Sequence, residues 1–172
     1  MIGGKRARDG EAAVTSKVDE GHFRAVLGHF ASGVVLVTGM HDDNPVGFTC
    51  QSFFSLSLDP PLVAFSPGKL STSWPKLAEA PGLCVNVLAS DQEDLARGFS
   101  KSGADKFAGV GWSPSPNGAP RLHGALAWID CEIASVVDGG DHLLVTARVE
   151  ALDASDGLPL VFYRGGFGRF QP

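Results

Sequence analysis

The order of apolar and polar residues predicts a chain of short strands joined by tight turns. Apolar and β-branched runs, which are typical of strands, lie at 34–38, 46–53, 62–66, 82–88, 125–137, 142–152 and 158–163. His41-Asp-Asp-Asn-Pro45 and Asp138-Gly-Gly-Asp141 are turn signals, and they indicate two hairpins. Strands joined by hairpins favour a mainly β fold, and we expect an antiparallel barrel with a few short flanking helices.

The first helix is predicted near the N-terminus, from about Glu20 to Phe30. Asp19 precedes it and can cap its first turn. Apolar residues recur there at helical spacing, at Phe23, Val26, Leu27 and Phe30. Because this spacing puts them on one side of a helix, we expect a stripe that faces a core.

Two further helices are expected between strands. A short one is predicted near 74–79. Another is predicted to start at Asp91, with Asp94 placed for a capping box and with Leu95 and Phe99 on one face. No glycine-rich dinucleotide or P-loop motif accompanies any of the strands, so the pattern argues against a doubly wound nucleotide-binding sheet.

Composition narrows the classes of function. The 172 residues suffice for one domain, which we place at 19–172 after a flexible leader at 1–18. The net charge of −5 argues against nucleic acid or an anionic membrane as main partner. No apolar run approaches the about 20 residues of a membrane span. Cys50, Cys84 and Cys131 lack CxxC spacing, and we interpret them as reduced, packed thiols in the cytoplasm.

The stretch from Val46 to Pro61 organises the chain. It reads as a strand, a hydroxyl-rich bend and a double-proline stop, followed by the apolar strand at 62–66. Five polar side chains occur in this apolar neighbourhood, at Thr49, Gln51, Ser52, Ser55 and Ser57. Buried hydroxyls need partners, and a phosphorylated cofactor is one source of them. The alternative is that the hydroxyls satisfy turns and helix caps in their own chain.

A phosphate can be held by serine hydroxyls and one lysine. Ser55 and Ser57 are expected on the same side of a strand, and Lys69 and Ser71 follow in a loop. Lys106 is either a second positive charge for the ligand or a solvated surface lysine. The spacing leaves both readings open.

Other chemistries find little support. His142 follows a hairpin turn, where it either hydrogen-bonds a substrate amide, assists proton movement or is structural. His-x-His and HExxH spacings are missing and the turn itself needs Asp42 and Asp43, so we expect no metal site. There is no GxSxG elbow, and nothing near Cys50 in sequence would activate a thiol.

Taken together, residues 23–170 resemble the flavin reductase family with the FMN-binding split-barrel fold. The main likeness is Val46-Gly-Phe-Thr-Cys-Gln-Ser-Phe-Phe-Ser-Leu-Ser-Leu-Asp-Pro-Pro-Leu-Val63. The resemblance also includes five shorter motifs in the family's order: Phe30-Ala-Ser-Gly-Val-Val-Leu-Val-Thr38, Cys84-Val-Asn-Val-Leu88, Asp105-Lys-Phe-Ala-Gly109, Gly140-Asp-His142 and Leu160-Val-Phe-Tyr-Arg-Gly-Gly166. His41-Asp-Asp, Cys50-Gln-Ser-Phe53 and Asp138-Gly-Gly-Asp-His142 are similar in particular to actinobacterial reductases that serve hydroxylases of phenolic steroid-ring intermediates.

The resemblance implies a homodimeric, cytoplasmic NAD(P)H:flavin oxidoreductase. FMN or FAD would accept hydride from NADH or NADPH, and the reduced flavin would diffuse to a partner monooxygenase that hydroxylates an aromatic or phenolic substrate. Two alternatives stay open. One is a split-barrel oxidase similar to pyridoxamine-phosphate oxidase that acts on another small molecule, and the other is a flavin-binding protein without turnover.

The resemblance also assigns site residues by position. The flavin ring would lie against Ser32, Gly33, Val34 and Val35, and its edge and ribityl chain against Thr49, Cys50, Gln51 and Ser52. The phosphate would be held by Ser55, Leu56, Ser57, Lys69 and Ser71, and the pocket completed by Asn86, Val87, Leu88, Phe99 and Lys106. His142, the catalytic candidate, and Arg164 would lie toward the nicotinamide nucleotide.

Overall fold

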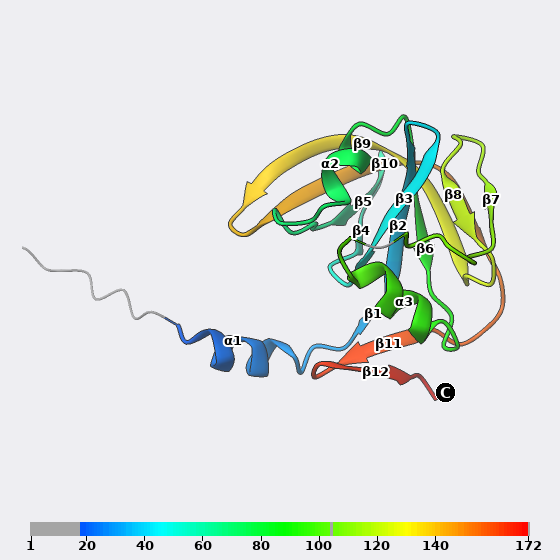
Figure 1. Cartoon of the computed structure of the whole chain (residues 1–172). Helices are drawn as coiled ribbons and strands as arrows, with labels where there is room; N and C mark the ends of the chain where they lie inside the picture. Colours follow the sequence, from blue (N-terminus) through cyan, green and yellow to red (C-terminus); the bar gives the residue numbers. More distant parts are fainter. Residues whose placement is uncertain (1–17, 104, 172) are drawn as a thin grey trace, which may run out of the picture.

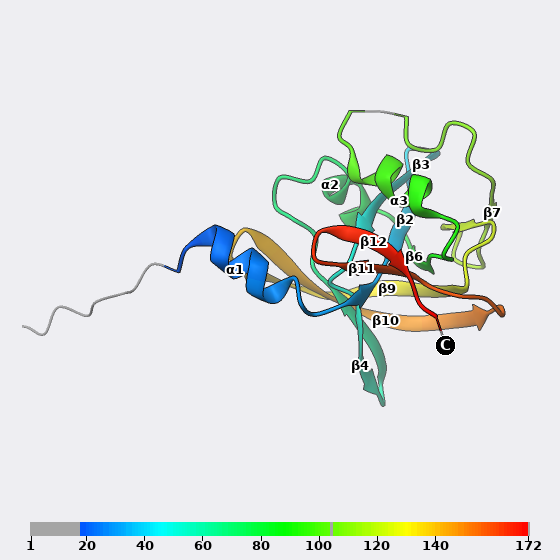
Figure 2. The same ribbon diagram turned by 90° about the horizontal axis from the view of Figure 1, so that it is seen from below.

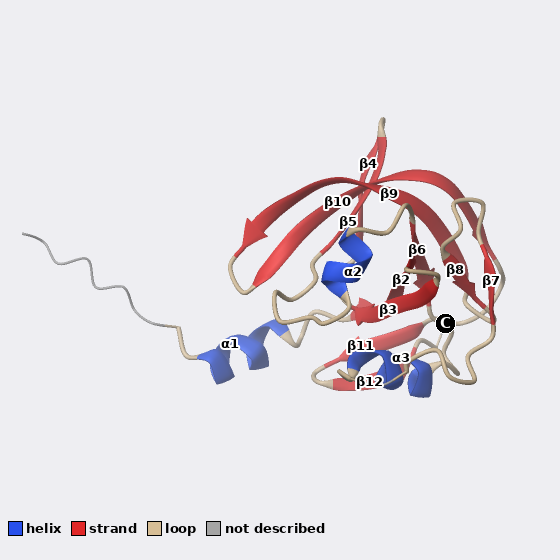
Figure 3. Cartoon of the chain, turned by 45° about the horizontal axis from the view of Figure 1, so that its top comes forward, coloured by secondary structure: helices blue, strands red, loops and turns tan. Residues whose placement is uncertain are grey.

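The computed structural model of the chain describes residues 18–103 and 105–171. Its largest unit is a seven-stranded antiparallel sheet with the strand order β3-β2-β6-β9-β10-β5-β4. In that order the strands are Asn44–Cys50, Val35–His41, Leu83–Val87, Ala127–Gly139, His142–Ala154, Pro61–Phe65 and Phe54–Leu58. The long strands β9 and β10 arch over the rest of the sheet in Figure 3. The mainly β, antiparallel fold is confirmed, and the predicted leader lies outside the described residues apart from Val18.

Two small sheets and three short helices complete the described chain. One sheet has the order β1-β11-β12, from Ser32–Gly33, Leu160–Tyr163 and Gly166–Arg169, and the other pairs β7 (Trp112–Pro114) with β8 (Pro120–Leu122). The helices are α1 (Glu20–Leu27), α2 (Trp74–Ala78) and α3 (Glu93–Ser100). In Figure 1, α2 and α3 lie near β3, and the β11–β12 hairpin lies below them. Strand β12 was not among the predicted elements.

Both predicted hairpins are confirmed. Asp42 and Asp43 join β2 to β3 with positive φ angles of 48° and 60°, a conformation in which Asp and Asn are the tolerated non-glycine residues. Gly140 and Asp141 join β9 to β10, and the Gly140 N–H donates to the Asp138 carboxylate. The second hairpin fixes where His142 emerges from the sheet.

Strand β2 is buried on both faces. Val35 and Val37 belong to one hydrophobic cluster, and Val34 and Leu36 to a second that also contains Phe99 from α3. A strand between two cores needs apolar side chains on both sides, which explains the uninterrupted apolar run. The three cysteines are buried and unbonded, and Cys50 and Cys131 belong to the first cluster, so the predicted free thiols are confirmed.

The predicted hydroxyl-rich bend contains strand β4, and a β-bulge changes its geometry. Ser55 lies opposite Val63 and Ser57 opposite Leu62, so Leu56 is an extra residue on β4. Residues directly opposite each other share a face, whereas consecutive residues point to opposite faces. Ser55 and Ser57 therefore lie on opposite faces of the sheet, and the prediction that they share one is wrong.

Helix α1 begins where it was predicted, but its apolar stripe faces no core. The Asp19 carboxylate accepts from the His22 N–H at 2.8 Å, which confirms the cap. The helix ends at Leu27, and the stripe of Phe23, Val26, Leu27 and Phe30 is 51–83% exposed. Figures 1 and 2 show α1 extending to one side of the sheets. Periodicity identified an amphipathic helix correctly, but it does not identify what covers the apolar side.

Helix α3 begins at Glu93, two residues later than expected. Gln92 occupies its N-cap position, and the Gln92 side chain accepts from the Ala89 N–H and donates to the His123 carbonyl. The predicted capping box at Asp94 is therefore wrong, although Phe99 is buried as expected. Of the described helices, none is long and apolar enough to cross a membrane.

Candidate functional site

A cavity of about 470 Å³ lies where the end of β3 meets α3, the start of β10 and the β11–β12 hairpin. We call it the main cavity. Its size is within the range of small-molecule sites. It is lined by Phe48, Thr49, Cys50, Gln51, Ser52, Ser66, Gly68, Arg97, Ser100, His142, Phe162 and Phe167. Five of these were predicted site residues, from Thr49 to Ser52 together with His142.

Two hydroxyls of the central stretch shape the wall of this cavity. Thr49 Oγ1 donates to the Ala96 carbonyl at 2.6 Å and so ties β3 to α3. Ser52 Oγ donates to the Ser66 carbonyl at 3.2 Å and accepts from the Ser66 N–H at 3.0 Å. This pair joins the exits of β3 and β5. Both hydroxyls thus have partners in the protein, and the Thr49 oxygen, which only donates, keeps capacity to accept a further bond.

Cys50 contributes a thiol that is held neutral. It is buried, and its Sγ lies 3.3 Å from Ser52 Oγ. Burial raises the pKa of the Cys50 thiol, because the thiolate would lose its hydration. The side chain therefore acts as a small packing group in the wall and not as a nucleophile.

His142 lies at the rim with one ring nitrogen engaged. Its Nδ1 is 2.8 Å from the Asp141 carboxylate, and this hydrogen bond lowers the pKa of Asp141. Because an ionised carboxylate only accepts, Nδ1 carries the hydrogen, and Nε2 of the neutral ring has a free lone pair. A Cβ on Gly68 would lie 3.5 Å from Nε2, which is ordinary van der Waals contact, so Gly68 is a direct neighbour of the ring.

Arg97 is a cavity residue that sequence reasoning missed. Its Nε and Nη2 donate to Glu93 Oε1 at 2.9 and 2.6 Å, and its guanidinium lies over the Phe167 ring. The i,i+4 spacing of Glu93 and Arg97 is a readable signal for the ion pair. No local sequence pattern predicts that β12 lies against α3. This packing brings the Phe167 ring of β12 to the Arg97 guanidinium at the cavity wall.

Several predicted residues lie in the core and not at the cavity. Val34, Leu88 and Phe99 are buried in one hydrophobic cluster, and Val35 is buried in the other, against which Val87 also packs. Asn86 is fully buried: its amide nitrogen donates to the Leu36 carbonyl and to Thr38 Oγ1, and its oxygen accepts from the Leu122 N–H. The Asn86 side chain therefore joins β2, β6 and β8.

The predicted phosphate-binding group is not brought together. Ser55, Leu56 and Ser57 lie on the outer strand β4, away from the lining of the main cavity. Lys69 pairs with Asp138 at 2.5 Å, and this contact lowers the pKa of the Asp138 carboxyl. Ser71 Oγ accepts from the N–H of Trp74, the first residue of α2, at 3.1 Å, and Ser73 occupies the N-cap position.

The remaining predicted residues occupy neighbouring positions. Ser32 lines a side cavity of about 380 Å³ that shares Gln51 and Phe162 with the main one. Gly33 and Arg164 are exposed, and Arg164 forms the β11–β12 turn with a φ of 50°. Lys106 Nζ donates to three protein acceptors, which makes it part of the framework.

Comparison with known proteins agrees with this architecture. The sequence pattern of the flavin reductase like domain matches residues 27–171. The chain belongs to the flavin reductase family. The resemblance found in the sequence motifs is thereby confirmed.

Three relatives of the flavin reductase family are similar over most of the chain. The reductase subunit HsaB of a flavin-dependent monooxygenase from Mycobacterium tuberculosis H37Rv is 47% identical over 92% of this chain and 87% of its own length. The crystal structure of a nitrilotriacetate monooxygenase component B homologue from Mycobacterium thermoresistibile has a TM-score of 0.87, at 46% identity over 90% of this chain and 88% of that one. The NADH:FAD oxidoreductase SgcE6 from Streptomyces globisporus, in complex with NAD and FAD fragments, has a TM-score of 0.84, at 36% identity over 90% and 94%.

Proposed function

We propose that the chain is an NAD(P)H-dependent flavin reductase that supplies reduced FMN or FAD to a separate monooxygenase, which hydroxylates an aromatic or phenolic substrate. The observation that carries this proposal is the main cavity, whose lining lies wholly within the segment matched by the family. The names of the Mycobacterium tuberculosis and Streptomyces relatives support the two halves of it, a monooxygenase partner and nicotinamide-driven flavin reduction.

The lining of the main cavity fits a planar ring with a polar edge. Phe48, Phe162 and Phe167 offer aromatic surface, and Thr49, Gln51 and Ser66 offer hydrogen-bonding groups. Such a mixture of aromatic walls and a few polar groups is typical of a cofactor site. When bound, a flavin supplies the electron carrier of the reaction, since it takes up hydride from the reduced nicotinamide.

The chain's own residues then bind and orient the flavin and the nicotinamide nucleotide. Gln51 and the acceptor lone pair of Thr49 would hold polar groups of the flavin, and the phenylalanines would exclude water from the site. His142 is the catalytic residue of this proposal: its Nε2 lone pair accepts a hydrogen bond from the carboxamide of the nicotinamide and so holds the donor at the cavity rim. No acid–base pair is needed, because hydride transfer depends mainly on alignment.

We infer that the working form is a homodimer in the cytoplasm. Exposed apolar side chains gather on α1, at Phe30 just after it and on β4. Phe30 is 83% and Leu58 90% exposed, and such groups are rarely left uncovered. The unbonded thiols suit a reducing compartment. The monooxygenase partner is reached through diffusing reduced flavin, so no large complementary surface is required.

A steady-state assay with the full chain tests the proposed function. We expect NADH or NADPH oxidation that rises with added free FMN or FAD and saturates. A requirement for another oxidisable substrate would instead indicate an oxidase of the pyridoxamine-phosphate oxidase type. Flavin binding without nucleotide oxidation under saturating conditions would contradict reductase activity.

A further inference from the structure

The lining of the main cavity has an unbalanced charge. In the part of the chain that the structure describes, it includes one arginine, Arg97, and one histidine, His142, but no aspartate or glutamate. The carboxylate that holds His142 belongs to Asp141, which lies outside the lining. Because a guanidinium stays protonated in proteins, Arg97 is the permanent charge of this cavity.

The Arg97 guanidinium is fixed by two neighbours. Its Nε and Nη2 both donate to Glu93 Oε1, and its central carbon lies over the Phe167 ring. Among the described residues, Nη1 donates to no acceptor. Glu93 does not line the cavity. The carboxylate therefore holds the arginine without facing the ligand, and Nη1 remains available to an acceptor in the cavity.

The carbonyl end of α3 is covered by donors. The last four carbonyls of a helix carry partial negative charge, and Ser100, the last residue of α3, lines the cavity. The Arg97 carbonyl accepts from Ser100 Oγ at 2.8 Å, and the Gly98 carbonyl accepts from the Lys101 N–H at 3.3 Å. The Phe99 carbonyl accepts from a lysine ammonium at 2.9 Å. Three of the four carbonyls thus have partners.

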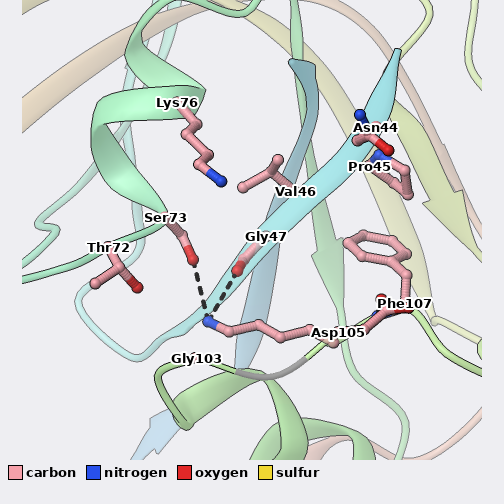
Figure 4. Close-up of a pocket in the computed structure, with 11 residues that line it drawn as sticks. Asn44, Pro45, Val46, Gly47, Thr72, Ser73, Lys76, Gly103, Asp105 and Phe107 are labelled. Atoms are coloured by element: carbon pink, nitrogen blue, oxygen red, sulfur yellow. Dashed lines mark hydrogen bonds between the residues drawn. The ribbon is translucent and has the colours of Figure 1, made fainter. Parts of the chain in front are cut away.

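The lysine at this helix end is Lys106. Its Nζ also donates to the Gly47 carbonyl at 3.2 Å and to Ser73 Oγ at 3.1 Å, and these two bonds are the dashed lines in Figure 4. All three of its acceptors are neutral groups. A full positive charge exceeds the partial negative charge of a helix end, so α3 does not cancel the charge of Arg97.

Hydride transfer changes the charge of a flavin ring. Two electrons and one proton pass from the reduced nicotinamide to a neutral ring, which leaves an oxidised nicotinamide and a reduced flavin with one negative charge. We propose that Arg97 recognises this negative charge, so that the main cavity binds reduced flavin more tightly than oxidised flavin. This inference rests on the proposed function and identifies the residue that discriminates between the two oxidation states.

Solvent limits the size of the effect. A nearby opposite charge favours the charged form of a group by roughly ten- to thousandfold. The Arg97 side chain is 56% exposed and shares its charge with Glu93, so we expect roughly three- to tenfold. For a two-electron couple, a tenfold preference for the reduced form raises the reduction potential by about 30 mV. So small a preference favours reduction and still lets the reduced flavin leave for a separate monooxygenase.

Arg97→Gln tests the proposal, because it removes the charge and keeps an amide donor in the wall. Arg148→Gln is the matched control, since Arg148 is an exposed arginine of β10 that does not line the cavity. Riboflavin is the probe, because it lacks phosphate and its charge changes only in the ring. Fluorescence quenching gives the dissociation constant of oxidised riboflavin. Anaerobic photoreduction with a reference dye gives the potential of free and bound riboflavin, and thus the dissociation constant of the reduced form.

We expect the wild type to bind reduced riboflavin more tightly than oxidised riboflavin. Arg97→Gln lowers the ratio of the two affinities roughly three- to tenfold and the potential by about 15–30 mV, whereas Arg97→Lys and Arg148→Gln retain both. Glu93→Gln is expected to act in the opposite direction. It leaves the charge of Arg97 without its carboxylate, so the preference for reduced riboflavin increases.

An unchanged potential in Arg97→Gln would overturn the proposal while flavin reduction itself stands. Equal weakening of oxidised and reduced riboflavin would overturn it as well, because such a loss reflects the shape of the wall and not its charge. Photoreduction needs no nicotinamide. A wild-type chain that shows the preference but oxidises no NADH or NADPH would therefore contradict the reductase activity and not the role of Arg97.

Discussion

The guanidinium carbon of Arg97 lies 4.7 Å from the centroid of the Phe167 ring. This contact joins α3 to β12 at the wall of the main cavity, and Glu93 holds the guanidinium from the other side. Arg97 and His142 are the two cavity-lining side chains that can carry positive charge. The stacked arginine therefore sets both the shape and the charge of this wall.

Replacing Arg97 by alanine is expected to raise the KM for flavin or NADH several-fold. The change removes a cation–π contact of about 0.5–2 kcal/mol and one positive charge from the cavity. Arg97→Lys keeps the charge but loses the planar stack on Phe167, so we expect an intermediate KM. Steady-state kinetics check both variants, and values equal to those of the wild type would remove Arg97 from the binding site.

His142→Ala is expected to raise the KM for NADH and to leave flavin affinity unchanged. The ring nitrogen Nε2, left free by the Nδ1 contact with Asp141, is the group that would meet the nicotinamide carboxamide. One lost hydrogen bond corresponds to about 0.5–1.5 kcal/mol, or a few-fold to tenfold in KM. His142→Gln retains a donor and acceptor and serves as the control. A change in flavin affinity with an unchanged KM for NADH would show that His142 contacts the flavin and not the nicotinamide.

Asn86→Leu is expected to destabilise the fold without changing the flavin affinity of the folded protein. Its amide joins Leu36, Thr38 and Leu122 across three strands in the core. A leucine there leaves the buried Leu122 N–H without its acceptor, at a cost of about 1–3 kcal/mol, whereas the Thr38 hydroxyl keeps its bond to the Pro120 carbonyl. Urea unfolding measures the loss, and fluorescence titration with FMN measures the affinity. Weaker FMN binding at unchanged stability would show that Asn86 takes part in flavin binding.

The same residue shows what a sequence can and cannot predict. The apolar run around Asn86 identified a buried strand correctly, since β-branched and apolar residues behave alike in any buried sheet. It could not tell whether the amide faces a ligand or a neighbouring strand, because both are polar partners for a buried group. Family motifs favoured a ligand, whereas the packing of β2 against β6 and β8 provides the partners internally.

Local chemistry was the reliable part of the sequence reasoning. The Asp42–Asp43 turn and the Asp19 cap were predictable because each depends on residues within a few positions. The meeting of Thr49 with His142 at one cavity followed from family motifs and not from spacing. The bulge at Leu56 left no signature, so alternation misplaced Ser57 relative to Ser55.

The Lys69–Asp138 pair yields a prediction about pH. The Lys69 hydrogen bond, followed by that of the Gly140 N–H, lowers the pKa of Asp138 below its ordinary 3.8. Because the folded-state pKa is depressed, the pair contributes stability above about pH 4 and loses it as the pH falls through the lowered pKa. Lys69→Ala is expected to raise the Asp138 pKa toward 3.8, as measured by NMR titration of the carboxyl carbon.

The same titration with FMN present tests the phosphate assignment of Lys69. If Lys69 stays on Asp138, the pKa of Asp138 does not change when FMN is added. If Lys69 leaves to bind the flavin phosphate, the carboxyl loses its main partner and its pKa rises. A rise would support Lys69 as a phosphate ligand, whereas no change would remove Lys69 from the phosphate site.

The Phe30→Ser variant tests whether the protein is a monomer or a homodimer. In a monomer this side chain is 83% exposed, so its replacement has almost no effect on stability. In a dimer that covers the α1 stripe, the loss of a buried phenylalanine costs about 3–5 kcal/mol at each of two equivalent positions and shifts the equilibrium toward monomers. Light scattering coupled to size exclusion measures the mass at several concentrations. Glu20→Ser, a polar change on α1 itself, is the control, and an unchanged mass for Phe30→Ser would place the interface elsewhere.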